Sequence, residues 1–347
     1  MDEQGGREES AGPRVDPAGN EHPAPSSAPQ ASFLYAVQTI LDKGQGLVAT
    51  SKITKGTRIL SEAPLFKVPP DKPNRKVKEA LIIKELKRLD KDQQRAYFAL
   101  HNAHGTDHSP FLGIARTNVL PLGSQAREGG LFLEASRINH SCRPNAQNTW
   151  NANIGRLTIH ALRDIKEGEE ITITYLDQTT EYVSRQQFLK GSFSFGCRCE
   201  LCVLPPARRR ESDGRLSEIN SIDEKLGQMG SRMFGYNKIL HLLRTMFRLF
   251  EEEGIWDASI PRAYYDAFQI ACMYGDDTRA KIFAERAHAA RVIIEGDDSP
   301  GVARLKRFAE QPTQHESYRR LAHSPRGVRP PQSVGGLEVD DWLWGEG

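Results

Sequence analysis

Short apolar segments separated by glycine turns open the part of the chain that can form a core. Their alternation of apolar and polar positions has the period of two that is typical of β-strands. Strands are predicted over residues 33–37, 47–50 and 58–60. Turns at residues 43–46 and 53–56 separate them, and the pattern returns to β over residues 130–176.

The second β region ends in a tyrosine. After a glycine turn at residues 166–168, Ile171, Ile173 and Tyr175 fall on one face of a predicted strand. A hydroxyl on an apolar face is either satisfied by a hydrogen bond in the core or functional. The pattern by itself favours a core tyrosine, so it leaves the role of Tyr175 open.

Between the two β regions the apolar period changes to that of a helix. Apolar residues between Leu81 and Leu89 recur at spacings near 3.6 residues. Asp92 is a suitable N-cap for a second helix that runs to His101. The sequence therefore predicts a helical insert at about residues 72–128.

Helical periodicity also dominates the C-terminal half of the chain. Helices are predicted over residues 216–227, 234–253, 260–274 and 277–295. Ser259 or Asp276 can cap the last two, and a glycine follows each of these helices. The last pair resembles a tetratricopeptide unit in length, although one pair does not establish a repeat. Residues 205–210, with two prolines and three arginines, are predicted to be a linker.

Composition sets the limits of the ordered chain. Residues 1–30 bury too little apolar surface to offset chain entropy and are predicted to be disordered. Residues 299–347 are rich in Pro, Gly and Arg and are predicted to be mostly disordered, apart from an acidic and aromatic end at 340–344.

The formal net charge of +2 does not demand a nucleic-acid partner. With no signal peptide and no apolar run of roughly 20 residues, we expect a location in the nucleus, the cytoplasm or both, and no membrane partner.

The cysteines point to a metal. Cys197, Cys199 and Cys202 have the spacing C-x-C-x-x-C, and zinc prefers four thiolate or imidazole ligands in a tetrahedron. Cys142, in a polar loop, is the best fourth donor. Cys272 lies in the apolar stripe of a helix and is predicted to be a small buried hydrophobic residue. The alternative, a loop of free thiols, is disfavoured because exposed thiols oxidise readily. A site closed by four thiolates predicts structural Zn²⁺.

Three motifs taken together resemble the SET-domain lysine methyltransferases. They are Arg137-Ile-Asn-His-Ser-Cys-Arg-Pro-Asn145, Gly168-Glu-Glu-Ile-Thr-Ile-Thr-Tyr175 and the cysteine spacing at 197–202. The resemblance covers about residues 33–203 and is strongest to the SMYD-like proteins and their small fungal relatives. It implies an α+β protein with a β-rich SET fold, a knot-like β-clip with a helical insert, followed by a zinc-bound post-SET segment and a helical C-terminal domain. The MYND zinc finger of SMYD proteins is absent, because residues 61–130 contain no cysteine.

Pattern and resemblance together divide the chain into five parts. They are a disordered tail at 1–30, a SET domain at 31–190, a post-SET zinc segment at 191–206, a helical TPR-like domain at 207–298 and a mostly disordered tail at 299–347.

The resemblance also implies roles for single residues. The positions implied to bind S-adenosylmethionine are Lys43, Gly44, Gln45, Gly46, Ser136, Asn139, His140, Tyr175 and Phe195. Within this set, Asn139 and His140 match the pair that binds the amino group and the adenine, Phe195 packs on the adenine, and Tyr175 is the catalytic tyrosine. Without the resemblance, Asn139 is a turn residue and Phe195 a core residue. Phe195 lies in a segment, residues 191–196, that we expect to be flexible and held mainly by the adjacent metal.

These motifs predict an S-adenosylmethionine-dependent protein lysine N-methyltransferase, a chromatin regulator that acts on a histone or non-histone lysine. One alternative is a non-catalytic SET-fold binding module or scaffold in chromatin regulation. The joint presence of Tyr175, Asn139, His140 and the glycine loop at residues 43–46 argues against it. A nucleic-acid-binding zinc protein is disfavoured further, since the cysteine spacing lacks the histidine pair of common DNA-binding fingers.

The expected partner is a protein substrate, and we expect a monomer. Basic residues add a second partner to consider. They are Arg208, Arg209, Arg210, Arg319, Arg320, Arg326 and Arg329. Such runs are usually solvated linker, but they can also contact the acidic surface of a nucleosome or act as a nuclear-import signal.

Overall fold

The computed structural model describes most of the chain after residue 33. The described residues are 34–69, 74–105, 109–123, 126–176, 180–228, 235–321 and 336–345, and for 336–339 they include the backbone only. Contacts group residues 34–347 in one compact unit. The tail predicted to be disordered at residues 1–30 lies outside the described residues, as do Arg326 and Arg329.

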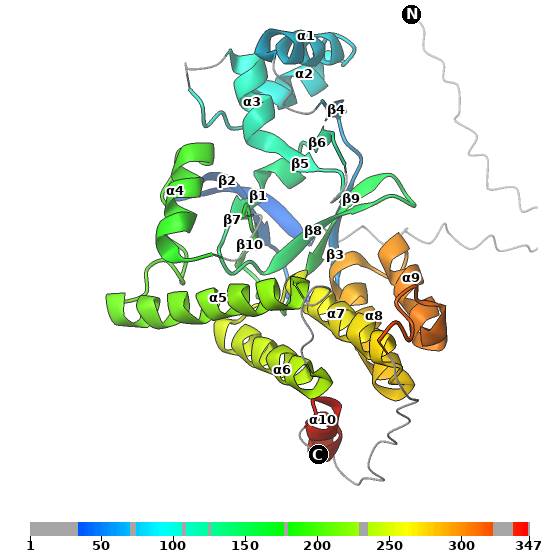
Figure 1. The fold of residues 1–347 in the computed structure, drawn as a ribbon. Coiled ribbons are helices and arrows are strands. Elements are labelled where there is room, and N and C mark those ends of the chain that lie inside the picture. The colour runs from blue at the N-terminus through cyan, green and yellow to red at the C-terminus, as the bar shows by residue number, and fades with distance from the viewer. Residues whose placement is uncertain are drawn as a thin grey trace, which may run out of the picture. The chain divides into compact units, whose positions relative to one another are not determined.

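The strands of the described residues confirm the two predicted β regions. They are β1 (Tyr35–Ile40), β2 (Gly44–Ala49), β3 (Arg58–Glu62), β4 (Phe66–Val68), β5 (Val119–Pro121), β6 (Gly129–Leu131), β7 (Asn139–His140), β8 (Ala146–Asn151), β9 (Arg156–Ala161) and β10 (Glu170–Ile173). They form three sheets, ordered β1-β2-β10-β7, β3-β9-β8 and β4-β6-β5 (Figure 1). The fold is thus mixed α and β, with all described strands in the first half of the chain.

The four-stranded sheet brings distant segments side by side. Strands β1 and β2 form an antiparallel hairpin, and Gly44 in its turn has a φ of 78°, a left-handed conformation that favours glycine. Strand β10 pairs antiparallel with β2, with Ile171 opposite Leu47. Strand β7 runs parallel to β10, with Asn139 opposite Thr172. The start of β10 thus lies beside the end of β2, and Asn139 of β7 lies beside the middle of β10.

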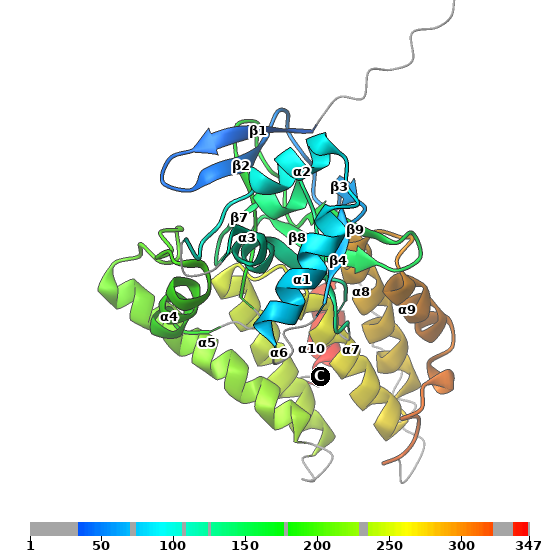
Figure 2. The ribbon, with the colours of Figure 1, turned by 90° about the horizontal axis from the view of Figure 1, so that it is seen from above.

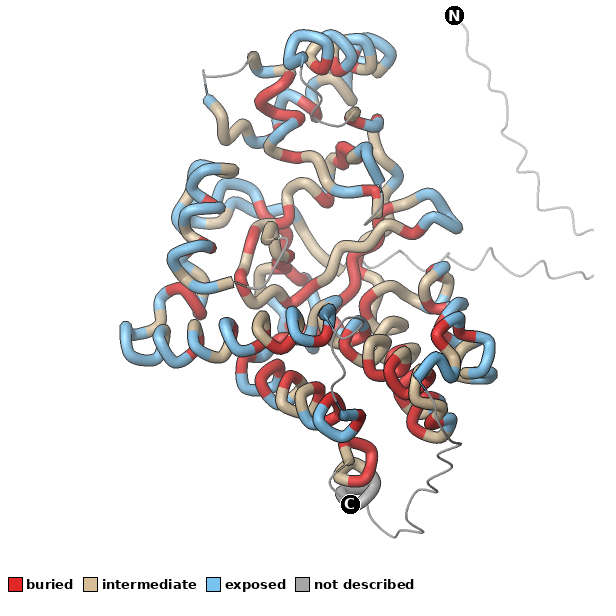
Figure 3. Tube along the Cα trace, in the orientation of Figure 1, coloured by how far each residue is buried: buried red, intermediate tan, exposed pale blue. Residues whose placement is uncertain are grey.

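The sheet β3-β9-β8 is covered on both faces. Leu157, Ile159 and Ala161 of β9 belong to the same buried cluster as Leu47 and residues of β10. The alternate residues of this strand are also buried, because helix α8 (Asp277–Glu295) contacts β8 and β9. Figure 3 shows this buried layer between the strands and the helical region. The strand therefore lacks the polar face that simple alternation suggests.

The predicted helical insert consists of α1 (Arg75–Leu86), α2 (Lys91–Phe98) and α3 (Pro110–Asn118). The cap of the second helix differs from the prediction. Asp90 accepts from the Gln93 backbone N–H, and the Gln93 side chain accepts from the Asp90 backbone N–H. This reciprocal capping box satisfies two donors at once, which Asp92 in the first turn cannot do. The helix ends at Phe98, three residues before His101.

The remaining helices are α4 (Tyr182–Phe193), α5 (Pro206–Gly227), α6 (Tyr236–Glu253), α7 (Ser259–Tyr274), α8 (Asp277–Glu295), α9 (Pro300–Glu310) and α10 (Gly336–Leu343), with short 3₁₀ helices at Ala135–Arg137 and Pro312–Gln314. Helices α7, α8 and α9 pack side by side (Figure 2). The predicted cap Asp276 accepts from Arg279 N at the start of α8, whereas Ser259 is the first residue of α7 and not its cap. Among the described helices, none combines the length and apolar character needed to cross a membrane.

Helix α5 corrects the predicted linker. It starts at Pro206, ten residues before the predicted start, so the arginines at 208–210 are helical. Proline suits the first turn of a helix because its missing N–H has no partner there anyway. Ser212 and Leu216 are buried, which gives this early part of the helix a packed face.

The tail predicted to be mostly disordered begins with a helix. Ser299 caps α9 through Gly301 N, Pro300 occupies its first turn, and Val302 and Leu305 are buried. The prediction of disorder was based on the high content of Pro, Gly and Arg and gave no weight to this cap and these apolar positions. At the other end, Trp344 packs on Phe247 and Phe283, with ring centroids 5.3 and 5.1 Å apart.

Glu253, at the end of α6, joins the helical region to the loop that carries Cys142. Its carboxylate is 2% exposed and lies 2.6 Å from Arg143 and 2.5 Å from Arg215. Ser212 Oγ donates a third hydrogen bond to it at 2.7 Å. A buried carboxylate with three donors is well satisfied, so this contact is a specific link between the two regions.

Replacing Glu253 with alanine is expected to lower the free energy of unfolding by about 3 kcal/mol, because two largely buried arginines lose their partner. Urea unfolding followed by circular dichroism measures this change. The matched control is the neighbouring Glu252→Ala, which removes an exposed pair with Arg248 and a long contact of 3.9 Å with Arg215, and should change stability by less than about 0.5 kcal/mol. Equal effects of the two substitutions would show that Glu253 is not a special link.

Candidate active site and metal centre

Four cysteine side chains converge where the loop after β7 meets the segment after α4. Their sulfur atoms all lie within 4.8 Å of one another. The Cys142 sulfur is 3.8 Å from that of Cys197 and 3.6 Å from that of Cys202. Corners of a tetrahedron with Zn–S bonds of about 2.3 Å are about 3.8 Å apart. The predicted ligands Cys142, Cys197, Cys199 and Cys202 therefore could hold a metal ion, whereas Cys272 is buried elsewhere, against the Pro312 carbonyl.

Helix α4 also holds the cysteine segment, which corrects the prediction of a flexible stretch fixed mainly by metal. The helix runs to Phe193, and Ser194 ends it in a left-handed conformation with φ 61°. Gln186 of this helix exchanges two hydrogen bonds with the Cys197 backbone, each 2.9 Å long. Within the cluster, hydrogen bonds from the other three thiols lower the pKa of Cys199 well below its usual range. A thiolate is the form of cysteine that binds metal.

His140 connects the cysteine cluster to Tyr175. Its Nδ1 accepts a hydrogen bond from the Tyr175 backbone N–H at 3.0 Å. The proton is therefore on Nε2, which lies 3.3 Å from the Cys142 sulfur and donates to it. Burial lowers the pKa of His140 to about 4, and the Lys43 and Arg185 charges act in the same direction. The ring is thus neutral at pH 7.

Tyr175 lies at the centre of an aromatic cluster just beyond the end of β10. Its hydroxyl donates to the Ile138 carbonyl oxygen at 2.7 Å. Its ring centroid is 5.3 Å from that of His140, 4.8 Å from that of Phe193 and 6.4 Å from that of Phe195. Burial raises the pKa of the Tyr175 hydroxyl above its ordinary value, so the group stays protonated at neutral pH. The structure thus brings together three residues that the sequence singled out, His140, Tyr175 and Phe195.

The glycine loop meets Asn139 across the sheet. The Asn139 side-chain nitrogen donates to the Gln45 carbonyl oxygen at 3.2 Å and to a Glu170 carboxylate oxygen at 2.9 Å. The other carboxylate oxygen of Glu170 lies 2.6 Å from Lys43 Nζ. A Cβ atom on Gly46 would come within 2.8 Å of the Asn139 nitrogen, so only glycine leaves room for this contact.

Two predicted side chains bond to neighbouring protein groups. Gln45 Nε2 donates to Thr39 Oγ1 across the hairpin at 2.9 Å. Ser136 Oγ donates to the Asn118 carbonyl oxygen at 2.8 Å.

Three residues of this region were missed in the sequence. Glu170 lies within the quoted Gly168-Glu-Glu motif, so its position could have been noticed. Phe193 precedes Phe195 by two residues in a Phe-Ser-Phe run, which is a signal of the same kind. Glu62 carries no such signal, because it acts at a distance along the chain: its carboxylate accepts from the backbone N–H groups of residues 133–135, at 2.7 to 3.3 Å.

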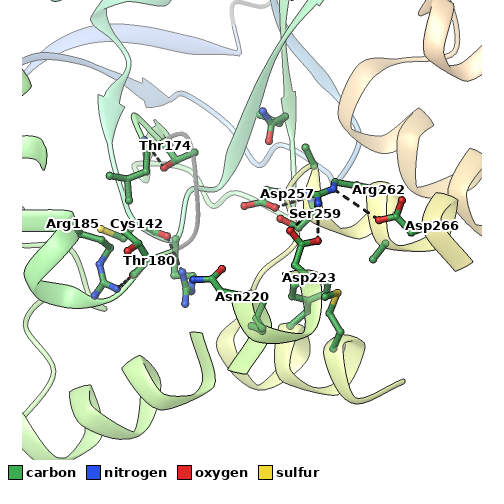
Figure 4. Close-up of a pocket in the computed structure, with 18 of the residues that line it drawn as sticks. Cys142, Thr174, Thr180, Arg185, Asn220, Asp223, Asp257, Ser259, Arg262 and Asp266 are labelled. Carbon is green, nitrogen blue, oxygen red and sulfur yellow. Dashed lines mark hydrogen bonds and ion pairs between the residues drawn. The ribbon is translucent and has the colours of Figure 1, made fainter. Parts of the chain in front are cut away.

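A pocket of about 500 Å³ lies between the end of β10 and helices α5–α7. Thr174 and Leu176, on either side of Tyr175 in the chain, line it. Figure 4 shows Cys142, Thr174 and Arg185 on one side and Asp223, Asp257, Arg262 and Asp266 on the other. Arg262 pairs with Asp223 at 2.6 Å, and burial raises the pKa of Asp266 to about 6.

The comparison with known proteins identifies the class. The family model described as the SET domain matches residues 44–176. Over 318 residues the chain is 34% identical to Histone-lysine N-methyltransferase set5 of Schizosaccharomyces pombe, an alignment that covers 91% of this chain and 96% of that protein. The chain therefore belongs to the SET-domain lysine methyltransferase family, which confirms the predicted resemblance.

More distant matches cover less of the sequence or share less of it. Protein-lysine N-trimethyltransferase SMYD5 of Homo sapiens is 43% identical over 77 residues, which are 21% of this chain and 18% of that protein. The crystal structure of the SET domain of LSMT bound to lysine and AdoHcy is 14% identical, with a TM-score of 0.36, and covers 81% of this chain and 88% of that one.

Proposed function

We propose that this chain transfers a methyl group from S-adenosylmethionine to a lysine side chain of a protein. The observation that carries the proposal is that the family's site residues meet around β10. The Tyr175 hydroxyl and the rings of His140 and Phe195 lie just beyond its end. The Asn139 side chain, on the neighbouring strand β7, bonds to the Gln45 carbonyl oxygen of the glycine loop. The proposed cofactor residues are those implied by the family: Lys43, Gly44, Gln45, Gly46, Ser136, Asn139, His140, Tyr175 and Phe195. For Gln45 and Ser136 the proposal rests on position alone, since their side chains bond elsewhere.

The reaction needs a neutral amine. A lysine with a pKa of about 10.4 is neutral only about once in 2,500 at pH 7. Bound S-adenosylmethionine supplies the methyl group and a sulfonium charge that disfavours a nearby ammonium. The aromatic cluster around Tyr175 adds desolvation in the same direction. No carboxylate base is needed for this deprotonation.

Tyr175 then aligns the amine. Its hydroxyl is protonated and already fixed by the Ile138 carbonyl oxygen at 2.7 Å, so its lone pair has a defined direction. Positioning of this kind can supply roughly 7–11 kcal/mol of the barrier. Phe193, whose ring centroid lies 4.8 Å from that of Tyr175, limits the space beside the hydroxyl.

For the metal we propose structural Zn²⁺ on Cys142, Cys197, Cys199 and Cys202. Supporting this choice, the donors are four thiols with tetrahedral spacing, and four protein ligands leave no open position for chemistry. The ion would join the Asn139–His140 segment to the segment of Phe195. The post-SET segment at 191–206, the other domain boundaries and the knot-like threading stay predictions.

For the substrate we propose a lysine of a histone or of another protein, and this proposal rests on the family alone. Tyr175 does not line the pocket of Thr174 and Leu176, and the carboxylates there are accompanied by Arg143, Arg185 and Arg262, so the pocket does not define the substrate. Action on histones implies a place in the nucleus. Contact of the basic residues with a nucleosome, action in the cytoplasm and a monomeric state stay predictions.

Incubation with labelled S-adenosylmethionine tests the function. Nucleosomes, free histones and a cell extract are offered as substrates, and the labelled lysine is mapped by mass spectrometry. We expect label on a lysine side chain of at least one of these proteins. Cofactor binding without labelling of any protein would favour the non-catalytic scaffold instead.

Replacing Phe195 with alanine is expected to weaken binding of S-adenosylhomocysteine roughly tenfold or more, because an aromatic ring stacked on a base contributes about 1–3 kcal/mol. Isothermal titration calorimetry measures the change. The control is Phe98→Ala, which removes a phenylalanine that is 46% exposed on the helical insert and should leave the affinity as it is. An unchanged dissociation constant for Phe195→Ala would exclude the stacking role.

A further inference from the structure

We infer that Glu170 is a positioning residue that fixes the orientation of the Asn139 carboxamide, so that its oxygen faces the α-ammonium group of the cofactor. This inference rests on the proposed function. It adds Glu170 to the site. Through Asn139, Glu170 would make the site bind S-adenosylhomocysteine more tightly than an analogue without the α-amino group.

The hydrogen bonds of Asn139 carry the argument. A carboxamide has two N–H donors and one acceptor oxygen. Both donors are used, one by the Gln45 carbonyl oxygen at 3.2 Å and the other by Glu170 Oε1 at 2.9 Å. Among the described residues, the Asn139 oxygen has no hydrogen-bond partner, and the side chain is only half-buried. That oxygen is therefore free to accept from a ligand.

The carboxylate decides between the two orientations of the amide. A rotation by 180° would turn the Asn139 oxygen toward Glu170 and Gln45, which present only acceptor atoms. The charged hydrogen bond would then be replaced by repulsion between oxygens. Loss of a hydrogen bond to a charged group changes an equilibrium roughly ten- to a hundredfold. Glu170 thus selects the orientation in which Asn139 accepts.

The sheet holds Glu170 in place for this task. It opens strand β10 opposite Val48 of β2, and its side chain is 18% exposed. Its second oxygen is 2.6 Å from Lys43 Nζ, which directs the first oxygen toward Asn139. A Cβ on Gly46 would lie 2.8 Å from the Asn139 nitrogen and 3.2 Å from the carboxylate. The glycine at this position therefore leaves room for the amide–carboxylate contact.

The chemistry selects the ligand group. An oxygen held as an acceptor binds a donor, and a cationic donor forms the stronger, charge-assisted hydrogen bond. The α-ammonium group of S-adenosylmethionine and of S-adenosylhomocysteine meets this requirement. An analogue with hydrogen in place of that amino group has nothing to donate.

The test compares two ligands on two variants by calorimetry. For Glu170→Gln, whose side-chain amide can bond to either orientation of Asn139, we expect S-adenosylhomocysteine to bind roughly two- to tenfold more weakly, because the accepting orientation is then only partly populated. The analogue that lacks the α-amino group should bind as it does to the wild type. The matched control is Glu169→Gln, the preceding residue, whose carboxylate pairs with Arg163 at 2.6 Å and accepts from Asn145. That variant should bind both ligands normally.

A mutant cycle separates positioning from a structural effect. In an Asn139→Ala background, Glu170→Gln should cause no further loss of S-adenosylhomocysteine affinity. An equal loss for both ligands, or an undiminished loss in the Asn139→Ala background, would overturn the inference. If Glu170→Gln does not fold, Glu170→Asp replaces it, because the shorter side chain withdraws the carboxylate from the Asn139 nitrogen. It should weaken binding of S-adenosylhomocysteine and not of the analogue, and an equal effect on both ligands would overturn the inference.

These outcomes also separate the inference from the proposed function. A protein that labels no lysine, but in which Glu170→Gln weakens binding of S-adenosylhomocysteine and not of the analogue, would refute the proposed methyl transfer and uphold the role of Glu170. A wild type that binds neither nucleoside would refute both.

Discussion

Replacing Tyr175 with phenylalanine is expected to lower the rate of methyl transfer roughly 10²- to 10³-fold, while S-adenosylhomocysteine binds with nearly unchanged affinity. The substitution removes one oxygen and leaves the ring against His140 and Phe193. The pocket should therefore keep its shape. The hydroxyl acts on the reacting amine rather than on the cofactor, so the loss should appear in the turnover number.

Single-turnover kinetics and calorimetry on the same preparation measure the two quantities. The chain offers a matched control in Tyr97, another buried tyrosine whose hydroxyl donates to a main-chain carbonyl oxygen, that of Phe111. Tyr97→Phe loses a comparable hydrogen bond in the helical insert and should leave turnover as it is. Undiminished turnover of Tyr175→Phe would refute the aligning role.

Removal of the metal is expected to weaken binding of S-adenosylhomocysteine about tenfold or more before the core unfolds, because the proposed ion would join the two cofactor segments in addition to the contacts of α4. Cys142 follows Asn139 by three residues, and Cys197 follows Phe195 by two. The hydrogen bond from His140 to the Cys142 sulfur extends the connection to the Tyr175 backbone. Loss of the ion should therefore loosen both sides of the proposed cofactor site together.

During a chelator titration, metal analysis measures the bound metal, calorimetry measures the affinity for S-adenosylhomocysteine, and circular dichroism measures unfolding of the core. Cys199→Ser should act like partial metal loss. Cys272→Ser is the control, because this thiol is buried against the Pro312 carbonyl oxygen, away from the cluster. Normal cofactor affinity in metal-free protein would refute the proposal that zinc joins the two cofactor segments, and so would purified protein without near-stoichiometric zinc.

Much of the candidate site was readable in the sequence because its motifs are short and contiguous. The four cysteines, the Asn139–His140 pair and Tyr175 all lie in runs whose spacing has a chemical meaning. Metal ligands and turn residues must have a particular chemical type, so few other patterns imitate them. Helices α6, α7 and α8 were predictable for a similar reason, since their apolar stripes and glycine stops are local signals.

Other features depend on contacts between segments that are far apart in the chain. Burial of both faces of β9 requires helix α8, and the packing of Trp344 requires α6 and α8. Helix α9 was missed because composition was weighed over its cap and its two buried residues. Helix α5 was started too late because two prolines suggested a linker, although proline also suits a first turn.

The sequence by itself determined the family, the four candidate metal ligands and the catalytic tyrosine candidate, because each depends on residue type at a fixed spacing. The tertiary structure alone decided what those residues touch. It joined Lys43, Glu170 and Asn139 across three strands, turned the Gln45 and Ser136 side chains to other partners, and set His140 between the cysteine cluster and Tyr175. Hydrogen bonds act over about 3 Å in space, and no local pattern specifies which distant donor and acceptor will meet at that distance.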